Sequence, residues 1–131
     1  MSKNYGTLQD KNGNNLFPVG IETVSNDNGI ALKFPDGTMI CYNSIVKTLT
    51  RDYNWMGWQI TQAQSIVFPV NFVGNIPIVN VSAYTYDYAT MIIYNDNPTL
   101  TGLPKFYIGS QDVQEITREH CIQYIAIGRW K

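Results

Sequence analysis

The closing segment of the chain, His120 to Trp130, is rich in β-branched and aromatic residues and contains no proline, which predicts a β-strand. Successive side chains of a strand point to opposite faces, so this segment has two apolar faces. One face carries Ile122, Tyr124, Ala126 and Trp130, and the other carries Cys121, Ile125 and Ile127. A strand that is apolar on both faces has to be covered on both. In so short a chain we expect another subunit to supply one of these covers.

A second strong pattern runs from Gly29 to Ser44, where two apolar arms flank Pro35-Asp36-Gly37. Pro and Asp favour a turn and Gly tolerates a positive φ, so the segment predicts a β-hairpin. Its second arm is also apolar on both faces, with Ile40 and Tyr42 opposite Met39, Cys41 and Ile45. Because it shares this trait with the closing segment, we expect the two to be neighbours in one sheet.

Shorter apolar or alternating segments predict further strands over residues 64–68, 76–86, 89–94 and 103–109. Residues 5–19 have the pattern of a short hairpin, and the polar residues 22–28 predict a loop or linker. Residues 110–119 predict a polar connection with room for a helical turn over 112–118. Short strands separated by regular turn signals indicate an all-β sandwich or barrel.

Composition narrows the class of protein. The 131 residues are most simply one domain, and 44% hydrophobic content is typical of a globular chain. Charged residues make up 15% and the net charge is −1, without a Lys/Arg cluster, so we expect neither a nucleic-acid nor a membrane partner. The N-terminus has no signal-peptide pattern, so we expect synthesis in a reducing cytoplasm and two buried free thiols, Cys41 and Cys121. A disulfide between them is the alternative.

Candidate chemistry is sparse. His120 is the single histidine, which excludes a metal site built on several histidines, and Cys121 beside it points to the opposite face of the strand. We expect His120 to lie at the surface or to be hydrogen-bonded to the backbone. The sequence predicts no enzyme, no cofactor and no metal site. The catalytic alternative is a glycosidase that uses Asp52 and Asp87 as its two acids.

Two segments, Arg51 to Trp58 and Ala83 to Tyr88, mix Tyr and Trp with Asp, Asn and Arg. Aromatic planes suit the apolar C–H faces of sugars, and the polar side chains suit their hydroxyls. The candidate carbohydrate-binding residues are Asp52, Tyr53, Asn54, Trp55, Trp58, Tyr84, Tyr86, Asp87 and Tyr88. The alternative is that these aromatic residues pack at the edge of the sandwich or between subunits.

Several motifs resemble those of phage tail-fibre tips, the receptor-binding heads that are similar to H-type lectins. The motifs are residues 32–42 (Leu-Lys-Phe-Pro-Asp-Gly-Thr-Met-Ile-Cys-Tyr), 66–72 (Ile-Val-Phe-Pro-Val-Asn-Phe), 106–108 and the ending at 124–131 (Tyr-Ile-Ala-Ile-Gly-Arg-Trp-Lys). The resemblance covers residues 29–131. It implies a six-stranded antiparallel β-sandwich that forms a homotrimer and recognises carbohydrate on the host surface.

Residues 8–19 are similar to a segment that often precedes such heads in phages of Gram-positive bacteria. We therefore divide the chain into an N-terminal attachment segment and linker (1–28) and a head (29–131). The expected function is that of a non-enzymatic virion protein, a tail-fibre tip or receptor-binding head. Its expected partners are two further copies of itself, a bacterial surface glycan, and other virion proteins bound through residues 1–20. The alternative is a structural head-fibre or decoration module that docks to the virion through that segment.

Overall fold

The computed structural model describes residues 11–12, 20–111 and 115–131, and these form ten β-strands and no helix. The strands are β1 (Glu22–Asn26), β2 (Gly29–Lys33), β3 (Thr38–Arg51), β4 (Tyr53–Trp55), β5 (Trp58–Ile60), β6 (Gln64–Val67), β7 (Ile78–Thr85), β8 (Met91–Tyr94), β9 (Gly102–Ser110) and β10 (Ile116–Arg129).

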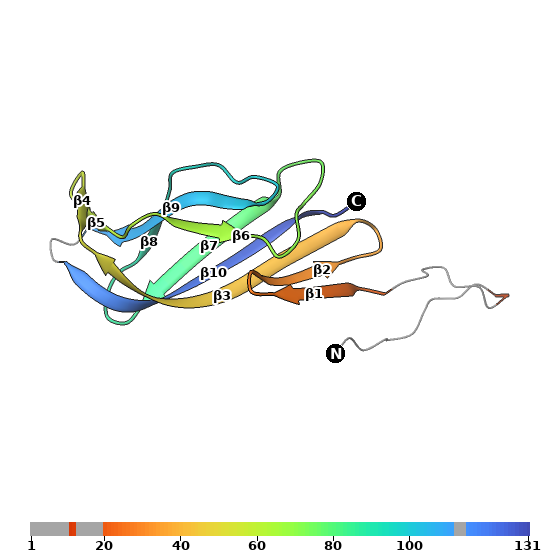
Figure 1. Ribbon diagram of the computed structural model, residues 1–131, viewed down its shortest axis with the longest axis horizontal. Coiled ribbons are helices and arrows are strands. Elements are labelled where there is room, and N and C mark those ends of the chain that lie inside the picture. Colours follow the sequence, from red (N-terminus) through yellow and green to blue (C-terminus); the bar gives the residue numbers. More distant parts are fainter. Residues whose placement is uncertain (1–10, 13–19, 112–114) are drawn as a thin grey trace.

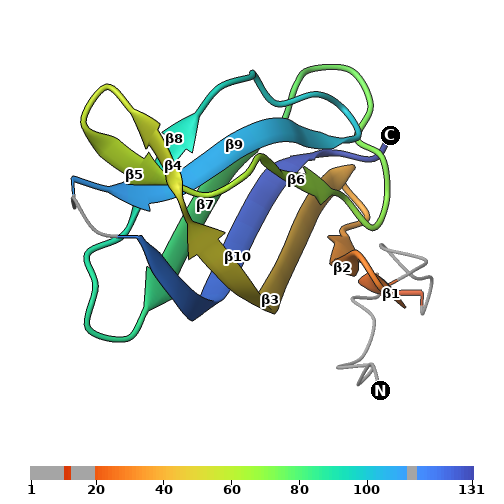
Figure 2. The same ribbon diagram turned by 60° about the vertical axis from the view of Figure 1, so that its left-hand side comes forward.

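Two antiparallel sheets pack face to face (Figures 1 and 2). The larger sheet has the order β1-β2-β3-β10-β7. The smaller has the order β4-β5-β9-β6, with β8 paired to β9 as well. This architecture confirms the predicted all-β sandwich. The described residues contain ten strands rather than the six that the resemblance implies, because several are only three to five residues long.

The closing strand β10 lies at the centre of the larger sheet. It pairs with β3 from Thr38↔Arg129 to Arg51↔Ile116, which confirms the predicted neighbours. Ile116 is buried and already belongs to the strand, so the helical turn expected over 112–118 is wrong from residue 116 onward. Residues 112–114 lie outside the described chain.

The two apolar faces of β10 differ in solvent exposure. Ile122, Tyr124 and Ala126 are buried between the sheets, as the core face requires. They share the core with Met39, Cys41, Phe68, Phe72, Leu103, Phe106 and Ile108. On the opposite face, Ile125 and Ile127 remain 43% and 41% exposed. Among the described residues, the sheet thus has one buried apolar face and one that is partly exposed.

Both cysteines are free, which confirms the thiol interpretation over the disulfide, but of the two only Cys41 is buried as predicted. Cys41 lies fully buried in the core, and burial raises the pKa of its thiol to about 11. Cys121 lies half-buried on the outer face, opposite Val46 rather than Cys41, with its Sγ 3.3 Å from Ser44 Oγ. The register of β3 and β10 therefore keeps the two thiols apart.

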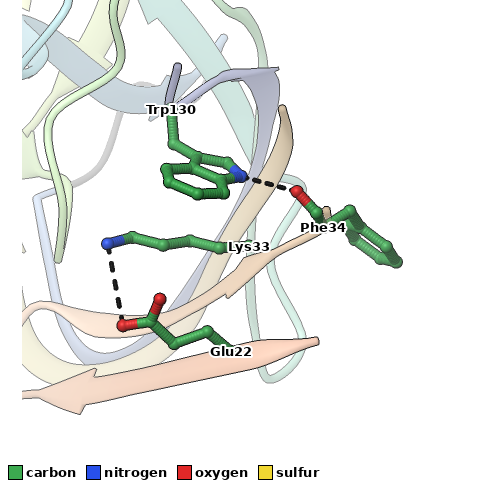
Figure 3. Close-up of polar contacts among 4 residues, drawn as sticks. All are labelled: Glu22, Lys33, Phe34 and Trp130. Atoms are coloured by element: carbon green, nitrogen blue, oxygen red, sulfur yellow. Dashed lines mark hydrogen bonds and ion pairs between the residues drawn. The ribbon is translucent and has the colours of Figure 1, made fainter. Parts of the chain in front are cut away.

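The loop predicted over residues 22–28 is wrong over 22–26, because β1 pairs with β2 along its whole length; residues 27 and 28 form the turn between the two strands. As a mostly exposed edge strand, β1 has no apolar alternation that the sequence could reveal. Side-chain contacts connect this edge of the sheet to the C-terminal segment (Figure 3). Lys33 Nζ lies 3.9 Å from Glu22 Oε1 and 5.3 Å from the centre of the Trp130 ring. The Trp130 indole N–H donates to Phe34 O at 2.8 Å.

The hairpin expected over 5–19 and most of the attachment segment 1–20 lie outside the described residues, so the division of the chain at residue 28 stays a prediction. The described sandwich has two distinct ends. Figures 1 and 2 place β4 and β5 at one end, and the C-terminus and the start of β1 at the other.

Candidate functional site

The segment from Tyr53 to Ile60 forms a tight hairpin of β4 and β5. Trp55 pairs with Trp58 across a two-residue turn in which Met56 (φ 50°) and Gly57 (φ 85°) both have positive φ. This is the signature of a type I′ turn, whose twist matches that of the strands. Asn54 Oδ1 accepts a hydrogen bond from the Gly57 N–H at 3.3 Å. The hairpin thereby holds Tyr53 and Trp55 in a defined position.

A groove of about 840 Å³ lies beside this hairpin, on the outer face of the smaller sheet. The core-facing Phe106 and Ile108 alternate with Tyr107, so Tyr107 points outward, as does its cross-strand partner Ile93. The lining consists of Asp52, Tyr53, Trp55, Ile60, Thr61, Gln62, Ala63, Ile93, Tyr94, Asn95 and Tyr107. Residues far apart in the sequence thus form one groove of ligand size.

A glycine makes room for the apolar base of the groove. Ile60 is buried and pairs with Gly109 of β9. A Cβ atom on Gly109 would lie 2.6 Å from Ile60 Cγ2 and 2.6 Å from Gln59 O, so any side chain there would displace β5. The close approach of β5 to β9 keeps the hairpin against the smaller sheet.

The lining of the groove combines aromatic rings with polar groups. Tyr53, Trp55 and Tyr94 are between 44% and 59% exposed, so their rings are accessible to a ligand. Gln62 and Asn95 add amide groups, and Asp52 adds a carboxylate. Among the described residues, Asp52 is the one charged side chain in this lining. Flat apolar faces and hydrogen-bonding groups therefore alternate within one surface.

The structure brings together only part of the predicted binding set. Asp52, Tyr53 and Trp55 line the groove, whereas Asn54 and Trp58 belong to the same hairpin but do not line it. The other four, Tyr84, Tyr86, Asp87 and Tyr88, lie on and after β7 and line a different part of the surface.

That second cluster is a tight turn between β7 and β8. Thr85 bridges to Tyr88 around Tyr86 and Asp87, with Asp87 at a φ of 61°. The Arg118 guanidinium lies 5.0 Å from the centre of the Tyr88 ring, which holds this ring against β10. Asp87 does not line the groove that contains Asp52, and Asp52 is the one acid among the described residues of the lining.

Arg51 and His120 form a buried polar pair behind the hairpin; both are fully inaccessible to solvent. His120 Nδ1–H donates to Arg118 O at 2.8 Å, and its Nε2 accepts from Arg51 Nε at 3.2 Å. Arg51 also donates to Ala89 O and Ser110 Oγ through Nη1 and to Thr90 Oγ1 through Nη2. The backbone hydrogen bond of His120 confirms one of its two expected settings, and its burial rules out the surface setting.

The groove residues Gln62, Tyr94, Asn95 and Tyr107 were not predicted. Tyr107 lies between Phe106 and Ile108, so the sequence suggests a core strand rather than a ligand surface. Tyr94 Oη donates to Val81 O at 3.5 Å, which fixes its ring across the edge of the sandwich. A weak signal exists in the alternation of β9, which places Tyr107 opposite to the core.

The outer face of the larger sheet is a second surface, and its apolar side chains are partly exposed within the described part of the chain. Cross-strand partners place Leu32, Ile40, Ile127 and Ile78 in one row, and Ile30, Tyr42, Ile125 and Asn80 in the next. A shallow hollow of about 470 Å³ lies over the second row, between Tyr42 and Ser82. Large apolar side chains thus form a continuous exposed patch on this face.

No group of three or more His, Cys, Asp or Glu residues in the described part of the chain is arranged to hold a metal ion. No helix among the described residues is long and apolar enough to span a membrane.

The fold resembles that of a pyocin fibre fragment. A structure of a Pseudomonas aeruginosa R1 pyocin fibre, comprising its C-terminal residues, superposes with a TM-score of 0.53 at 14% sequence identity. The match covers 84% of this chain and 29% of that chain, so the chain spans under a third of the fibre fragment. An N-truncated R1-type pyocin tail fibre is similar at 12% identity, with a TM-score of 0.47 and coverage of 84% and 88%. No protein-family model and no curated protein matches the sequence.

Proposed function

We propose that this chain is the receptor-binding head of a phage-type fibre, a virion protein that binds host-surface carbohydrate without cleaving it. The observation that carries the proposal is the groove of about 840 Å³ in which Tyr53, Trp55, Tyr94 and Tyr107 lie beside Asp52, Gln62 and Asn95. The similarity of the fold to a pyocin fibre fragment supports the fibre context.

The chemistry of the groove suits a sugar. Aromatic rings pack against the C–H face of a pyranose, and carboxylate and amide groups bond its hydroxyls. The groove is open, and Tyr53, Trp55 and Tyr94 are about half exposed, so contacts with these rings exclude water only partly. We therefore expect weak binding at each site, with a non-catalytic role because Asp52 is the single acid of the described lining.

The position of the groove also fits a fibre head. The β4–β5 hairpin that borders it lies at the end of the molecule remote from the start of β1 (Figure 1). A head joined to its virion through the chain that precedes β1 would present this end to the host. This arrangement supports the proposed attachment through residues 1–20.

We also propose that the head is a homotrimer formed through the outer face of the larger sheet. Ile78, Ile125 and Ile127 are 75%, 43% and 41% exposed in the single chain. Leaving such side chains in water costs roughly 25 cal/mol for each Å² that could be buried. Further copies of this chain are the occupant that matches the apolar rows, as the motif resemblance implies. Three linked grooves would raise avidity by effective concentration.

Glycan binding is tested with two alanine variants of exposed aromatic residues. Trp55→Ala removes a ring that lines the groove, whereas Tyr86→Ala removes one from the β7–β8 turn. On an array of bacterial surface glycans, we expect Trp55→Ala to weaken binding about tenfold or more and Tyr86→Ala to leave it unchanged. Binding that depends on Tyr86 instead would move the site to the other turn. An array without any bound glycan would refute the proposed function.

The homotrimer is tested by sedimentation. Ile125→Glu places a charge in the apolar patch, and Val67→Glu places the same charge on an exposed residue of β6 in the smaller sheet. We expect wild type and Val67→Glu to sediment as trimers and Ile125→Glu as folded monomers. A wild-type protein that sediments as a folded monomer at micromolar concentration would refute the trimer.

A further inference from the structure

The charges around the groove carry an inference about which sugars it takes. Asp52 contributes a carboxylate at the rim, where it is exposed to solvent and to a ligand. Within the described chain, no Lys, Arg or His side chain lines the groove. Lys105 lies on β9 two residues before Tyr107 and on the same outer face, and its carbonyl accepts a hydrogen bond from the Asn95 N–H at 3.4 Å, so it borders the groove without lining it. The fixed charge within the described lining itself is therefore negative.

The aromatic residues act in the same direction. The faces of Tyr and Trp rings carry negative electrostatic potential and attract cations. Four such residues, Tyr53, Trp55, Tyr94 and Tyr107, line the groove together with Asp52. A ligand ammonium group would be attracted by both the rings and the carboxylate. A ligand carboxylate or phosphate would be repelled and would find no cationic partner in this lining.

We infer that the groove selects sugars bearing a positive charge, such as an amino group, over neutral sugars, and neutral sugars over acidic ones. Asp52 is the specificity-determining residue in this ordering. The inference rests on the proposed function, because it assigns the chemical class of the sugar that this groove binds. It also predicts that phosphate-rich and uronic-acid polymers of bacterial surfaces are poor ligands for this site.

The expected size of the effect follows from exposure. A unit charge at contact distance from an exposed carboxylate gains or loses roughly fivefold in affinity when the surroundings are close to water. Salt screens such a charge within about 10 Å at 0.1 M ionic strength. The preference should therefore shrink as salt is added, whereas the contacts of the rings with the sugar face should not.

The test uses three monosaccharides of one ring shape: glucosamine, glucose and glucuronate. Each sugar is added to the full chain at neutral pH, up to high millimolar sugar concentration. The NMR signal of the Trp55 indole N–H reports its binding. We expect affinity to decrease in that order, roughly fivefold at each step. In Asp52→Asn the three affinities should converge. Asp27→Asn removes the same charge from the turn between β1 and β2 and should leave the order unchanged.

The outcomes separate the inference from the proposed function. If glucuronate binds as tightly as glucosamine, or if Asp52→Asn keeps the wild-type order, the inference is overturned and the glycan-binding proposal stands. If none of the three sugars shifts the Trp55 signal, the groove is not a sugar site and both are overturned. If added salt leaves the size of the preference unchanged, the Coulombic origin of the preference is refuted.

Discussion

The buried pair of Arg51 and His120 makes stability depend on pH in a way that can be isolated. Burial lowers the pKa of His120 below 6.5 in the folded chain, and the charge of Arg51 lowers it further, against the raising effect of the hydrogen bond to Arg118 O. The neutral ring is required here, because its Nε2 accepts from Arg51 Nε at 3.2 Å. A protonated ring would place two cations side by side in the interior.

The sign of the effect follows from the lowered pKa. Above pH 6.5 both folded and unfolded chains hold a neutral histidine, and the free energy of unfolding does not depend on this group. Below 6.5 the unfolded chain binds a proton that the folded chain does not bind until the pH reaches the lower, folded-state pKa. We therefore expect stability to be lost as pH falls through this window, by at most about 1.4 kcal/mol per pH unit.

His120 is the single histidine of the chain, so few other groups titrate in this range. The assay is urea unfolding between about pH 7 and pH 5 at a fixed protein concentration, because an oligomer unfolds in a concentration-dependent manner. His120→Gln keeps an acceptor for Arg51 but does not titrate, and its stability should be flat over the window. A decrease of equal size in His120→Gln, or no decrease in wild type, would refute the buried neutral histidine.

Two further predictions concern the fold. Phe106→Ala empties a fully buried position between the sheets and should lower the free energy of unfolding by about 3–5 kcal/mol. The control Val67→Ala changes an exposed residue and should alter this free energy by less than about 0.5 kcal/mol. Equal effects of the two variants in denaturant unfolding would contradict the core assignment. Gly37→Ala puts a side chain on a residue with a φ of 97°, where its Cβ would also clash with the Arg129 guanidinium. It should cost roughly 1–3 kcal/mol, and a melting temperature equal to that of wild type would show that the turn relaxes freely.

The sequence revealed the parts of the fold that apolar patterns determine. The pairing of β3 with β10 was predictable because both are apolar on both faces, and the turn at Pro35-Asp36-Gly37 because its residues are specific for turns. Strand β1 was missed because an exposed edge strand needs no apolar alternation; its partner β2 supplies the hydrogen bonds. The hydrophobic pattern of a segment does not predict a strand that is held in the sheet mainly by the backbone of its neighbour.

The same limit applied to the candidate site. Asp52, Tyr53 and Trp55 were predictable from the aromatic and polar composition of the segment 51–58. The sequence could not show that Tyr94 and Tyr107, some forty to fifty residues later, line the same groove. Arg51 begins the aromatic segment in the sequence, yet it is buried because its partners at Ala89, Ser110 and His120 converge on it. Contacts with distant segments thus determine which of two adjacent side chains is buried: Arg51 faces inward and Asp52 faces outward.

The two proposed surfaces lie on opposite outer faces of the sandwich, so one does not exclude the other. The groove faces away from the core on the smaller sheet, and the apolar rows face away from the core on the larger sheet. Association through the larger sheet would therefore leave the grooves on the outside of the assembly. Affinity at one site then depends on the groove, whereas avidity depends on association through the larger sheet. A monomeric Ile125→Glu head should keep the groove that Trp55 lines. Any decrease in its glycan binding relative to the trimer therefore measures the contribution of association.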